Sequence, residues 1–451
     1  MRQRSPLTPI LSLAALLLAG GLAPQARASG FQLREQSASS LGNAFAGATA
    51  GAQDITSMYW NPATMALFDG RQASIGGSWV GVRMDLGQAA GTRAPNFEPG
   101  TDRTISGPSS LPNAVSQPVL PNLSGTWALN ARVTLGLSVN VPFGMVTNYP
   151  DTFLGRYHGL RTDLKIIDVA PAIAFKANPA WSFGAALVAR KATATITEAV
   201  DFGAIGSING VPGLHPGAQD GLASLTGDCW AYGYKVGFTF QPDPVFRLGV
   251  GYQGATTLKV DGQVSYQNVP TLLGSFFPNG GGKADLKLPA TASAGFDYHL
   301  TDTFSVQGEW AWTGWSTFKE LRVRFASGQA DSVTDESWRS TKYTSLGCTW
   351  KLSPVWTLRA GLAYDQSPVD DLHRTPRIPD GDRTWYSVGA AWAASATTVV
   401  DFGYTRIQAK DSTLNLRTGS DPAGDNFYRG NVDGSYKINA NMVALSVRLR
   451  M

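Results

Sequence analysis

The sequence predicts an all-β transmembrane fold, a 14-stranded antiparallel outer-membrane β-barrel with an N-terminal helical plug, or hatch, in its lumen. Three observations predict this fold. The 451-residue chain opens with an export signal, its later segments alternate apolar and polar residues with a period of two, and the joins between these segments alternate between short and long. The texture agrees, because only 16% of residues are charged while 50 are glycine and 47 are Trp, Tyr or Phe (13, 14 and 20).

Residues 1–28 are predicted to be a secretory signal peptide. Arg2 and Arg4 form a positive start, Ile10 to Leu22 is an apolar stretch, and Ala26-Arg27-Ala28 fits a small-x-small cleavage site. The apolar stretch is shorter than the roughly 20 residues of a spanning helix, so a membrane anchor is disfavoured. The mature chain is expected to begin near Ser29 and to reach the bacterial outer membrane.

Residues 29–70 are predicted to form the plug. This segment is rich in small residues, and "SMYWNPATMALFDG" (57–70) holds aromatic and apolar residues with no Lys, Arg or Glu. It shows no strand alternation, so it has no place in a barrel wall, and it most simply folds inside the bore. Asn61, Pro62 and Ala63 form the plug motif, in which the Asn side chain and the fixed φ of Pro set a sharp turn.

Residues 71–451 are predicted to form the barrel. "CWAYGYKVGFTF" places Trp230, Tyr232 and Tyr234 on one face and Gly233 and Lys235 on the other. Strands of this kind are apolar towards lipid and polar towards a lumen, and closure leaves no edge unpaired in the bilayer. The Trp and Tyr excess is typical of interfacial aromatic girdles.

The joins predict the strand number and the orientation. Short joins lie at 130–131, 177–180, 242–244, 301–302, 353–354 and 394–397, and long loops lie near 87–119, 143–162, 199–227, 267–282, 314–337, 366–382 and 417–433. Seven long loops and six short turns give 14 strands with both chain ends at the periplasmic side. The ninth strand is the weakest, since Gly314 and Trp315 interrupt its pattern.

Several function classes find no support in the residues. The net charge of +4 is scattered, which gives no basic stripe for nucleic acid. No metal-ligand spacing, catalytic residue set or cofactor motif stands out, and the four His lie in outer loops or, for His299, beside a periplasmic turn. The distant Cys229 and Cys348 are assigned no chemistry. The chain is therefore predicted not to be an enzyme.

Four stretches of the chain resemble a known family. They are "SGFQLREQSASSLGNAFAG", "YWNPATMALFDG", "LTDTFSVQGEWAWTGWSTFKELRV" and "TLRAGLAYDQSPVDDLHRTPRIPDGDRTWYSVGAAW". Together they resemble the outer-membrane transporters of long-chain fatty acids and other hydrophobic compounds (FadL-like, OMPP1/FadL/TodX). One departure from the pattern is the final Met451, where outer-membrane barrels commonly end in an aromatic residue.

The resemblance implies passive uptake by capture at outer loops, binding in an apolar lumen pocket and lateral exit at a kinked third strand. Pro142, Phe143 and Gly144 match the lateral opening, because Pro donates no ladder hydrogen bond and Gly packs no side chain. The alternative is that Pro142 simply ends its strand. Phe31 matches a pocket residue of the N-terminal segment, with a plain contact to the wall as its alternative.

The resemblance also implies cations that receive a carboxylate. By parity the inward-facing bases are Arg190, Lys235, Arg322, Arg324, Arg339 and Arg359. Of these, Arg190, Arg322 and Arg339 match the substrate-binding strands of the family. Each has the alternative role of a lumen charge that pairs with Glu309, Asp297 or Asp401 to hold the wall.

The predicted function is uptake of hydrophobic molecules, with long-chain fatty acid as the leading class. Uptake of aromatic hydrocarbons is the near alternative, while a barrel lipid hydrolase and a general porin are more distant ones. The expected partners are a long-chain fatty acid or other hydrophobic small molecule and outer-membrane lipid, with no nucleic acid, and the chain is expected to be a monomer.

Overall fold

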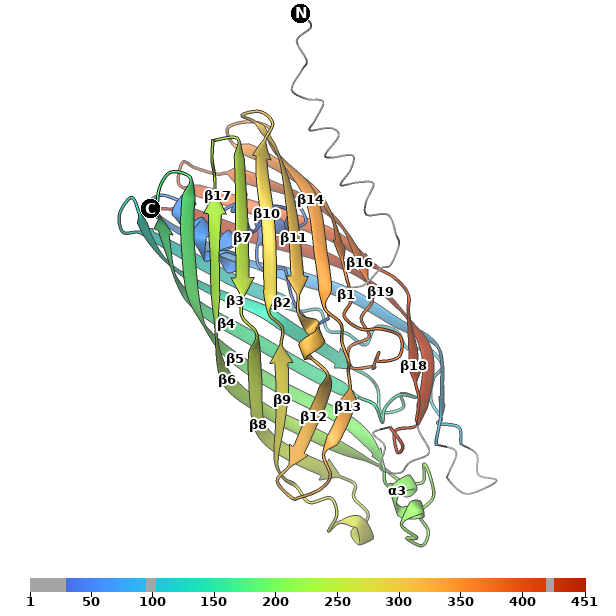
Figure 1. Cartoon of the computed structure of the whole chain (residues 1–451). Coiled ribbons are helices and arrows are strands. Elements are labelled where there is room, and N and C mark those ends of the chain that lie inside the picture. The colour runs from blue at the N-terminus through green and yellow to red at the C-terminus, as the bar shows by residue number, and fades with distance from the viewer. Residues whose placement is uncertain (1–29, 95–102, 419–425) are drawn as a thin grey trace, which may run out of the picture.

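A computed structural model describes residues 30–94, 103–418 and 426–451, and in these residues it has the predicted barrel (Figure 1). All strands belong to one antiparallel sheet, in which β1 (Arg71–Thr92) pairs with β19 (Asn431–Arg450). Because this pairing joins the first and last strands, the sheet closes on itself. The predicted 14-stranded antiparallel barrel is confirmed. The predicted signal peptide, residues 1–28, lies outside the described residues.

Nineteen strand segments form the 14 wall strands of the described chain, because five wall strands are interrupted: β7/β8, β9/β10, β11/β12, β13/β14 and β17/β18. The segments between β1 and β19 are β2 (Val119–Ala128), β3 (Val133–Asn148), β4 (Arg161–Lys176), β5 (Trp181–Asp201), β6 (Asp220–Phe240), β7 (Phe246–Gln253), β8 (Thr256–Gln267), β9 (Gly280–Leu288), β10 (Thr291–His299), β11 (Phe304–Thr313), β12 (Glu320–Phe325), β13 (Ser332–Asp335), β14 (Thr341–Lys351), β15 (Trp356–Asp365), β16 (Arg383–Ala393), β17 (Thr398–Ala409) and β18 (Ser412–Leu416).

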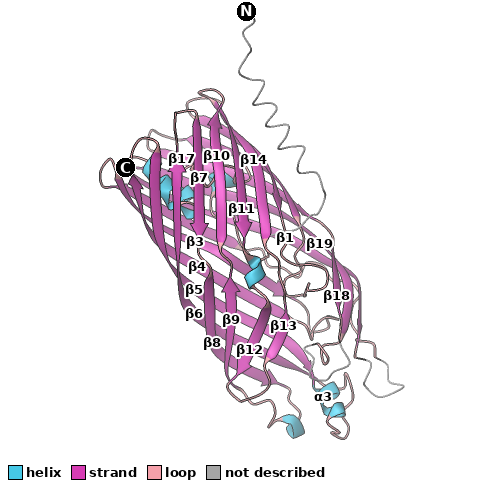
Figure 2. Cartoon of the chain, in the orientation of Figure 1, coloured by secondary structure: helices cyan, strands magenta, loops and turns pink. Residues whose placement is uncertain are grey.

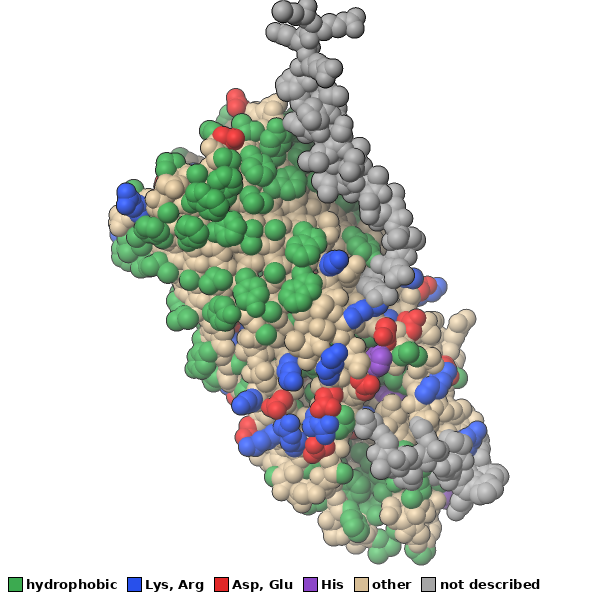
Figure 3. Space-filling model, in the orientation of Figure 1, with side chains coloured by type: hydrophobic (Ala, Val, Ile, Leu, Met, Phe, Trp, Pro, Cys, Tyr) green, Lys and Arg blue, Asp and Glu red, His purple; other side chains and the backbone are tan. Residues whose placement is uncertain are grey.

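The wall strands alternate between lipid and lumen as predicted. On β5, Phe183 and Leu187 are exposed on the outer face, while Ser182, Val188 and Arg190 are buried on the inner one. Outward apolar side chains cover much of one end of the barrel, and charged side chains gather beyond them (Figure 3). The surface that faces the lipid hydrocarbon is therefore an apolar band, and charged residues begin at its edge.

Several strands run farther than the sequence indicates. Loops are expected near 87–119, 143–162 and 199–227, but β1 continues to Thr92, β3 to Asn148 and β5 to Asp201. These predicted loop bounds are wrong because the outer ends of the strands carry polar side chains on their outward face, so the apolar alternation that marks a strand is missing. The predicted break in the ninth strand is present, with η4 (Trp315–Thr317) between β11 and β12.

Residues 30–70, here called the lumen segment, fold inside the barrel around three short helices (Figures 1 and 2). These are α2 (Ala38–Leu41), η1 (Ile55–Tyr59) and η2 (Pro62–Leu67). Most side chains between positions 34 and 65 are buried. Two further helical turns, α3 (Phe202–Ile208) and η3 (Thr271–Leu273), lie at the end of the barrel away from the C-terminus (Figure 1). None of the helices in the described residues is both long and apolar enough to cross a membrane.

Candidate functional site

Glycines of the wall mark where the lumen segment rests. A Cβ built on Gly361 would lie 2.1 Å from the Asn43 carbonyl oxygen, and one built on Gly249 would lie 2.0 Å from that of Thr49. No real Cβ approaches a backbone oxygen so closely, so only glycine fits where the backbone of the segment touches the strands. The sequence shows these glycines, but the parity argument gives them no role. Their inward positions are the signal that could have revealed the contact.

The plug motif fastens the lumen segment to itself and to the wall. Asn61 Oδ1 accepts a hydrogen bond from the Ala63 amide at 3.0 Å, and Asn61 Nδ2 donates to the carbonyl oxygens of Thr49 and of Phe238, each at 2.9 Å. Pro62 follows Asn61 as the first residue of η2, where its missing N–H costs nothing. One side chain thus caps η2 and ties the turn to β6.

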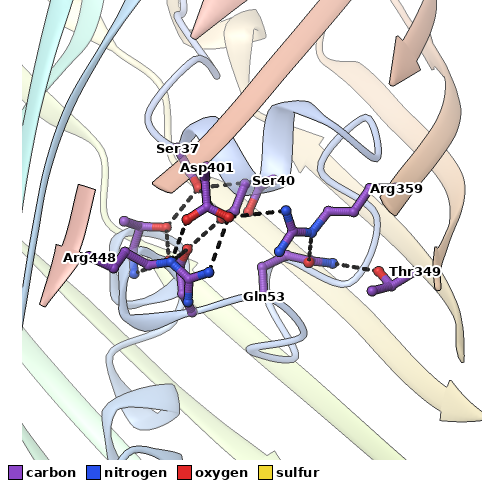
Figure 4. Close-up of polar contacts among 10 residues, drawn as sticks. Ser37, Ser40, Gln53, Thr349, Arg359, Asp401 and Arg448 are labelled. Atoms are coloured by element: carbon purple, nitrogen blue, oxygen red, sulfur yellow. Dashed lines mark hydrogen bonds and ion pairs between the residues drawn. The ribbon is translucent and has the colours of Figure 1, made fainter. Parts of the chain in front are cut away.

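A buried polar network joins residues 53 and 54 of the lumen segment to the strands β15, β17 and β19 (Figure 4). Asp401 on β17 accepts hydrogen bonds from Arg359 Nη1 and Arg448 Nη2, each at 3.1 Å. Arg359 Nε donates to Gln53 Oε1 at 2.7 Å, and Arg448 Nε lies 3.4 Å from Asp54 Oδ2. We call these five residues the polar latch. Since the Asp401 and Arg359 side chains are fully and almost fully buried, each charge depends on its partners for compensation.

An aromatic cluster surrounds Phe31 deeper in the bore. The Phe31 ring centroid lies 4.7 Å from Trp315, 5.7 Å from Trp338, 5.9 Å from Phe143 and 6.2 Å from Phe318. All five side chains are at most 2% exposed. The structure thus brings the predicted residues Phe31 and Phe143 together. It adds Trp315, Phe318 and Trp338, which the alternation argument missed because they lie where the ninth and tenth wall strands leave the wall.

The structure separates the three predicted cations. Arg190 is buried and forms two 2.7 Å hydrogen bonds to Asp168, which neutralises its charge, and its Cζ lies 5.5 Å from the Phe143 ring centroid. Arg339 is half-buried, and its Nε is buried without a hydrogen-bond partner among the described residues. The Arg339 amide donates to the Pro368 carbonyl oxygen at 3.1 Å. Among the described residues, no carboxylate forms an ion pair with Arg339.

The inward placement predicted for Arg322 is wrong. Arg322 lies on the outer face of β12, where it pairs with Glu320 at 2.6 Å and with Asp331 at 2.9 Å. The irregular residues between β11 and β12 reset the alternation, so Leu321 and Val323 face inward in its place. Arg324 shares the outer face and pairs with Asp285. Parity could not have found this, since it assumes an unbroken strand.

The wall is incomplete beside Pro142. The pairing of β2 with β3 stops at Leu123 and Val139, yet β3 continues to Asn148, so the alternative that Pro142 ends its strand is wrong. Its register with β4 shifts between Asn140 and Phe143. A kink at this position is therefore present.

The lumen segment replaces the missing strand at this kink. The Leu33 amide donates to the Pro142 carbonyl oxygen at 2.9 Å, and the Gly144 amide donates to the Phe31 carbonyl oxygen at 3.1 Å. The Gln36 side chain donates to the Val141 carbonyl oxygen at 2.7 Å and accepts from the Val141 amide at 3.2 Å. We call this junction the seam. Its backbone groups are satisfied by chain that is not part of the wall.

Two cavities accompany these features. One, of about 170 Å³, adjoins the seam and is lined by Phe31, Leu33, Val80, Val141, Met145 and Met442, with Arg383 beside Asp380. The other, of about 280 Å³, opens among the outer strand ends and has the apolar side chains of Leu225, Val264, Leu321, Val323 and Phe325. In the outer one, Arg377 and Arg429 share the single carboxylate of Glu198, at 2.7 and 3.4 Å. Both cavities thus combine apolar lining residues with at least one guanidinium group.

Glu336 makes the outer part of the aromatic cluster sensitive to pH. Burial raises the pKa of Glu336 from 4.5 to about 8, although the Trp338 indole N–H donates to its carboxyl group at 2.9 Å. The folded state therefore holds a proton that the unfolded chain releases near pH 4.5. Its contribution to the free energy of unfolding falls as the pH rises from about 4.5 to about 8.

We expect residues 336–340 to exchange amide hydrogens faster at about pH 9 than at about pH 6, after correction for the intrinsic pH dependence of exchange. Hydrogen exchange followed by mass spectrometry of the peptide that contains Trp338 checks this expectation. Glu336→Gln keeps the hydrogen-bonding shape without the titration, so its corrected exchange should be the same at both pH values. A wild-type peptide with equal protection at both would contradict it.

The His and Cys side chains of the described residues form no metal site. They contain no group of three His, Cys, Asp or Glu side chains that could hold a metal ion. Cys229 and Cys348 are both free thiols. His158 is buried, with its Nε2 2.9 Å from the Gly430 carbonyl oxygen.

A closed barrel with an apolar outer band, an internal segment and apolar cavities defines an outer-membrane protein that handles hydrophobic compounds. The chain belongs to the outer membrane protein transport protein family (OMPP1/FadL/TodX), whose model matches residues 20–451. It is a transport protein of the bacterial outer membrane and not an enzyme.

Relatives of known name extend over nearly the whole chain. The 47 kDa outer membrane protein of Pasteurella multocida is 28% identical over all of both chains. The long-chain fatty acid transport protein of Escherichia coli O6:H1 is 29% identical over 85% of this chain and 87% of its own. Outer membrane protein P1 of Haemophilus influenzae is 30% identical over 89% and 90%.

Solved structures share the fold. A FadL homologue of Pseudomonas aeruginosa superimposes with a TM-score of 0.82 at 23% identity, covering 94% of this chain and all of the other. The Pseudomonas putida toluene transporter TodX gives 0.64 at 16% identity, covering 93% and 99%. At these identities the likeness concerns architecture alone.

Proposed function

We propose that the protein takes up long-chain fatty acids, by capture in the outer cavity, binding among the aromatic cluster and lateral exit at the seam. The observation that carries this proposal is Arg339, a cation without a counter-charge in the described residues that directly follows the cluster residue Trp338. An aliphatic chain gains about 0.8 kcal/mol for each CH₂ that it buries in such surroundings, and an unpaired guanidinium selects the carboxylate end. The names of the long-chain fatty acid transport relatives support the same cargo.

In this mechanism residues 29–70 act as the plug. The wall glycines, the plug motif and the polar latch hold it in the bore, so water and ions find no open path. Cargo then leaves through the wall where β3 lacks a neighbour, once residues 31–36 release their hydrogen bonds to Val141, Pro142 and Gly144. The transporter works as a monomer, because bore, cavities and seam all belong to one chain.

A binding assay with labelled oleate tests the cargo. Arg339→Ala is expected to weaken oleate binding about tenfold or more, the size of a lost charge-assisted hydrogen bond, and to leave binding of oleyl alcohol unchanged. Arg322→Ala is the matched control, since Arg322 belongs to the neighbouring wall strand but faces outward and is paired. It should bind oleate as the wild type does.

The alternative cargo is an aromatic hydrocarbon, which has no carboxylate to anchor. If toluene binds while oleate affinity is unaffected by Arg339→Ala, the fatty-acid proposal fails and the aromatic one replaces it.

A further inference from the structure

The outer face of the barrel changes from apolar to charged within one outward step on several strands. On β4 the next outward-facing residue beyond the exposed Ile167 is Lys165. On β6 the next one beyond Trp230 is Asp228. Beyond this boundary the charged side chains form a belt across the barrel (Figure 3). We call the following residues the charged belt: Lys165, Lys191, Lys259, Lys283, Lys287, Arg322, Arg324, Asp163, Asp228, Asp261, Asp285 and Glu320.

The belt is continuous because its members lie opposite each other in the sheet. Successive Cα partners across β4, β5, β6, β8, β9 and β12 are Lys165, Thr193, Asp228, Asp261, Lys283 and Arg324. Asp228 and Asp261 are thus directly opposed, an arrangement of like charges that costs energy unless a partner compensates it. The row therefore lies on paired strands of the barrel wall and not on its loops.

The charges of the belt do not cancel. Within it, five cations form ion pairs with belt acids: Lys165 with Asp163, Lys191 with Asp228, Lys283 with Asp261, Arg322 with Glu320 and Arg324 with Asp285. Lys259 and Lys287 are exposed and form no ion pair with any described residue. Seven cations against five acids leave a net positive surface, with threonines and Gln263 lining a polar depression between β5 and β8.

We propose that the charged belt binds the phosphorylated saccharide head groups of the glycolipid in the outer leaflet. The belt begins where the lipid-facing apolar band ends, at the end of the barrel away from the short turns and the C-terminus, which is the external end. Phosphate groups match the free ammonium groups of Lys259 and Lys287, and sugar hydroxyls match the threonines and carboxylates of the depression. This inference does not depend on the cargo.

The test uses the full-length protein in phosphatidylcholine vesicles that contain bisphosphorylated lipid A, with native mass spectrometry to count the lipid A retained per barrel. The triple variant Lys259→Gln, Lys283→Gln and Lys287→Gln is expected to bind lipid A about tenfold more weakly. The matched control is Arg132→Gln, Lys351→Gln and Arg450→Gln, which removes three exposed cations from the periplasmic end and should bind as the wild type does.

Equal retention by both triple variants would overturn the proposal. So would equally tight binding of dephosphorylated lipid A or of phosphatidylglycerol, because either result would remove the phosphorylated saccharide as the ligand. If the belt variant does not assemble, the wild type decides alone. Its retention of lipid A should fall as NaCl rises, and retention that is independent of salt contradicts an electrostatic belt.

Discussion

Asp401→Ala is expected to lower the free energy of unfolding by about 3–5 kcal/mol, the cost of breaking a buried ion pair from one side. Asp401 is fully buried and accepts hydrogen bonds from both Arg359 and Arg448. Alanine leaves both guanidinium groups without this carboxylate, while Asp54 and Gln53 of the lumen segment still lie within reach of them. Urea titration of the barrel in detergent micelles, followed by tryptophan fluorescence, measures the change.

Asp85→Ala is the matched control for this experiment. Asp85 pairs with Arg83 on the outer end of β1 at 2.8 Å, but the two side chains are 35% and 67% exposed. A surface pair of this kind contributes about 0–1 kcal/mol, because water screens it and both side chains lose rotamer freedom. If Asp401→Ala costs no more than Asp85→Ala, the polar latch does not stabilise the folded chain.

Much of the wall could be predicted because a single physical rule controls it. Lipid requires a closed sheet, and closure imposes the alternation that is visible in "CWAYGYKVGFTF" and in the short turns. The rule fails where hydrocarbon ends. Beyond Lys165 and Lys191 the outward face carries polar side chains, so the outer strand extensions are read as loops.

The site was predicted only in part, because it is built from departures from that rule. Phe31 and Phe143 could be named through a family resemblance, and they do lie together. Trp315 and Trp338 could not be predicted, since they enter the bore where the ninth and tenth wall strands are interrupted. The same interruption turned Arg322 outward. The alternation of apolar and polar residues cannot predict which residues face inward beyond such an interruption. The three-dimensional structure is needed to assign them.

Gly361→Leu is expected to displace the lumen segment and to open the bore to ions. The Cβ alone would lie 2.1 Å from the Asn43 carbonyl oxygen, and both partners are backbone, so no side chain can turn aside. Overpacking of this kind costs about 1–3 kcal/mol even where side chains can adjust, so we expect release of the segment rather than accommodation. Single-channel recording in planar bilayers should show steady conductance for the variant and none for the wild type.

Gly125→Leu is the control that separates plug displacement from damage to the wall. Gly125 lies on the same outward face as the exposed Leu123 and Trp127, and the nearest atom to an added Cβ is the Gln72 carbonyl oxygen at 3.8 Å. A leucine side chain there faces lipid, which accommodates an apolar group, and we expect the bore to stay closed. Conductance in both variants would point to a leaking wall, whereas a silent Gly361→Leu barrel that still folds would mean that the lumen segment does not block the bore. Gly361 contacts the lumen segment through backbone atoms. The substitution therefore removes no side-chain contact, and a change in conductance reports the position of the segment.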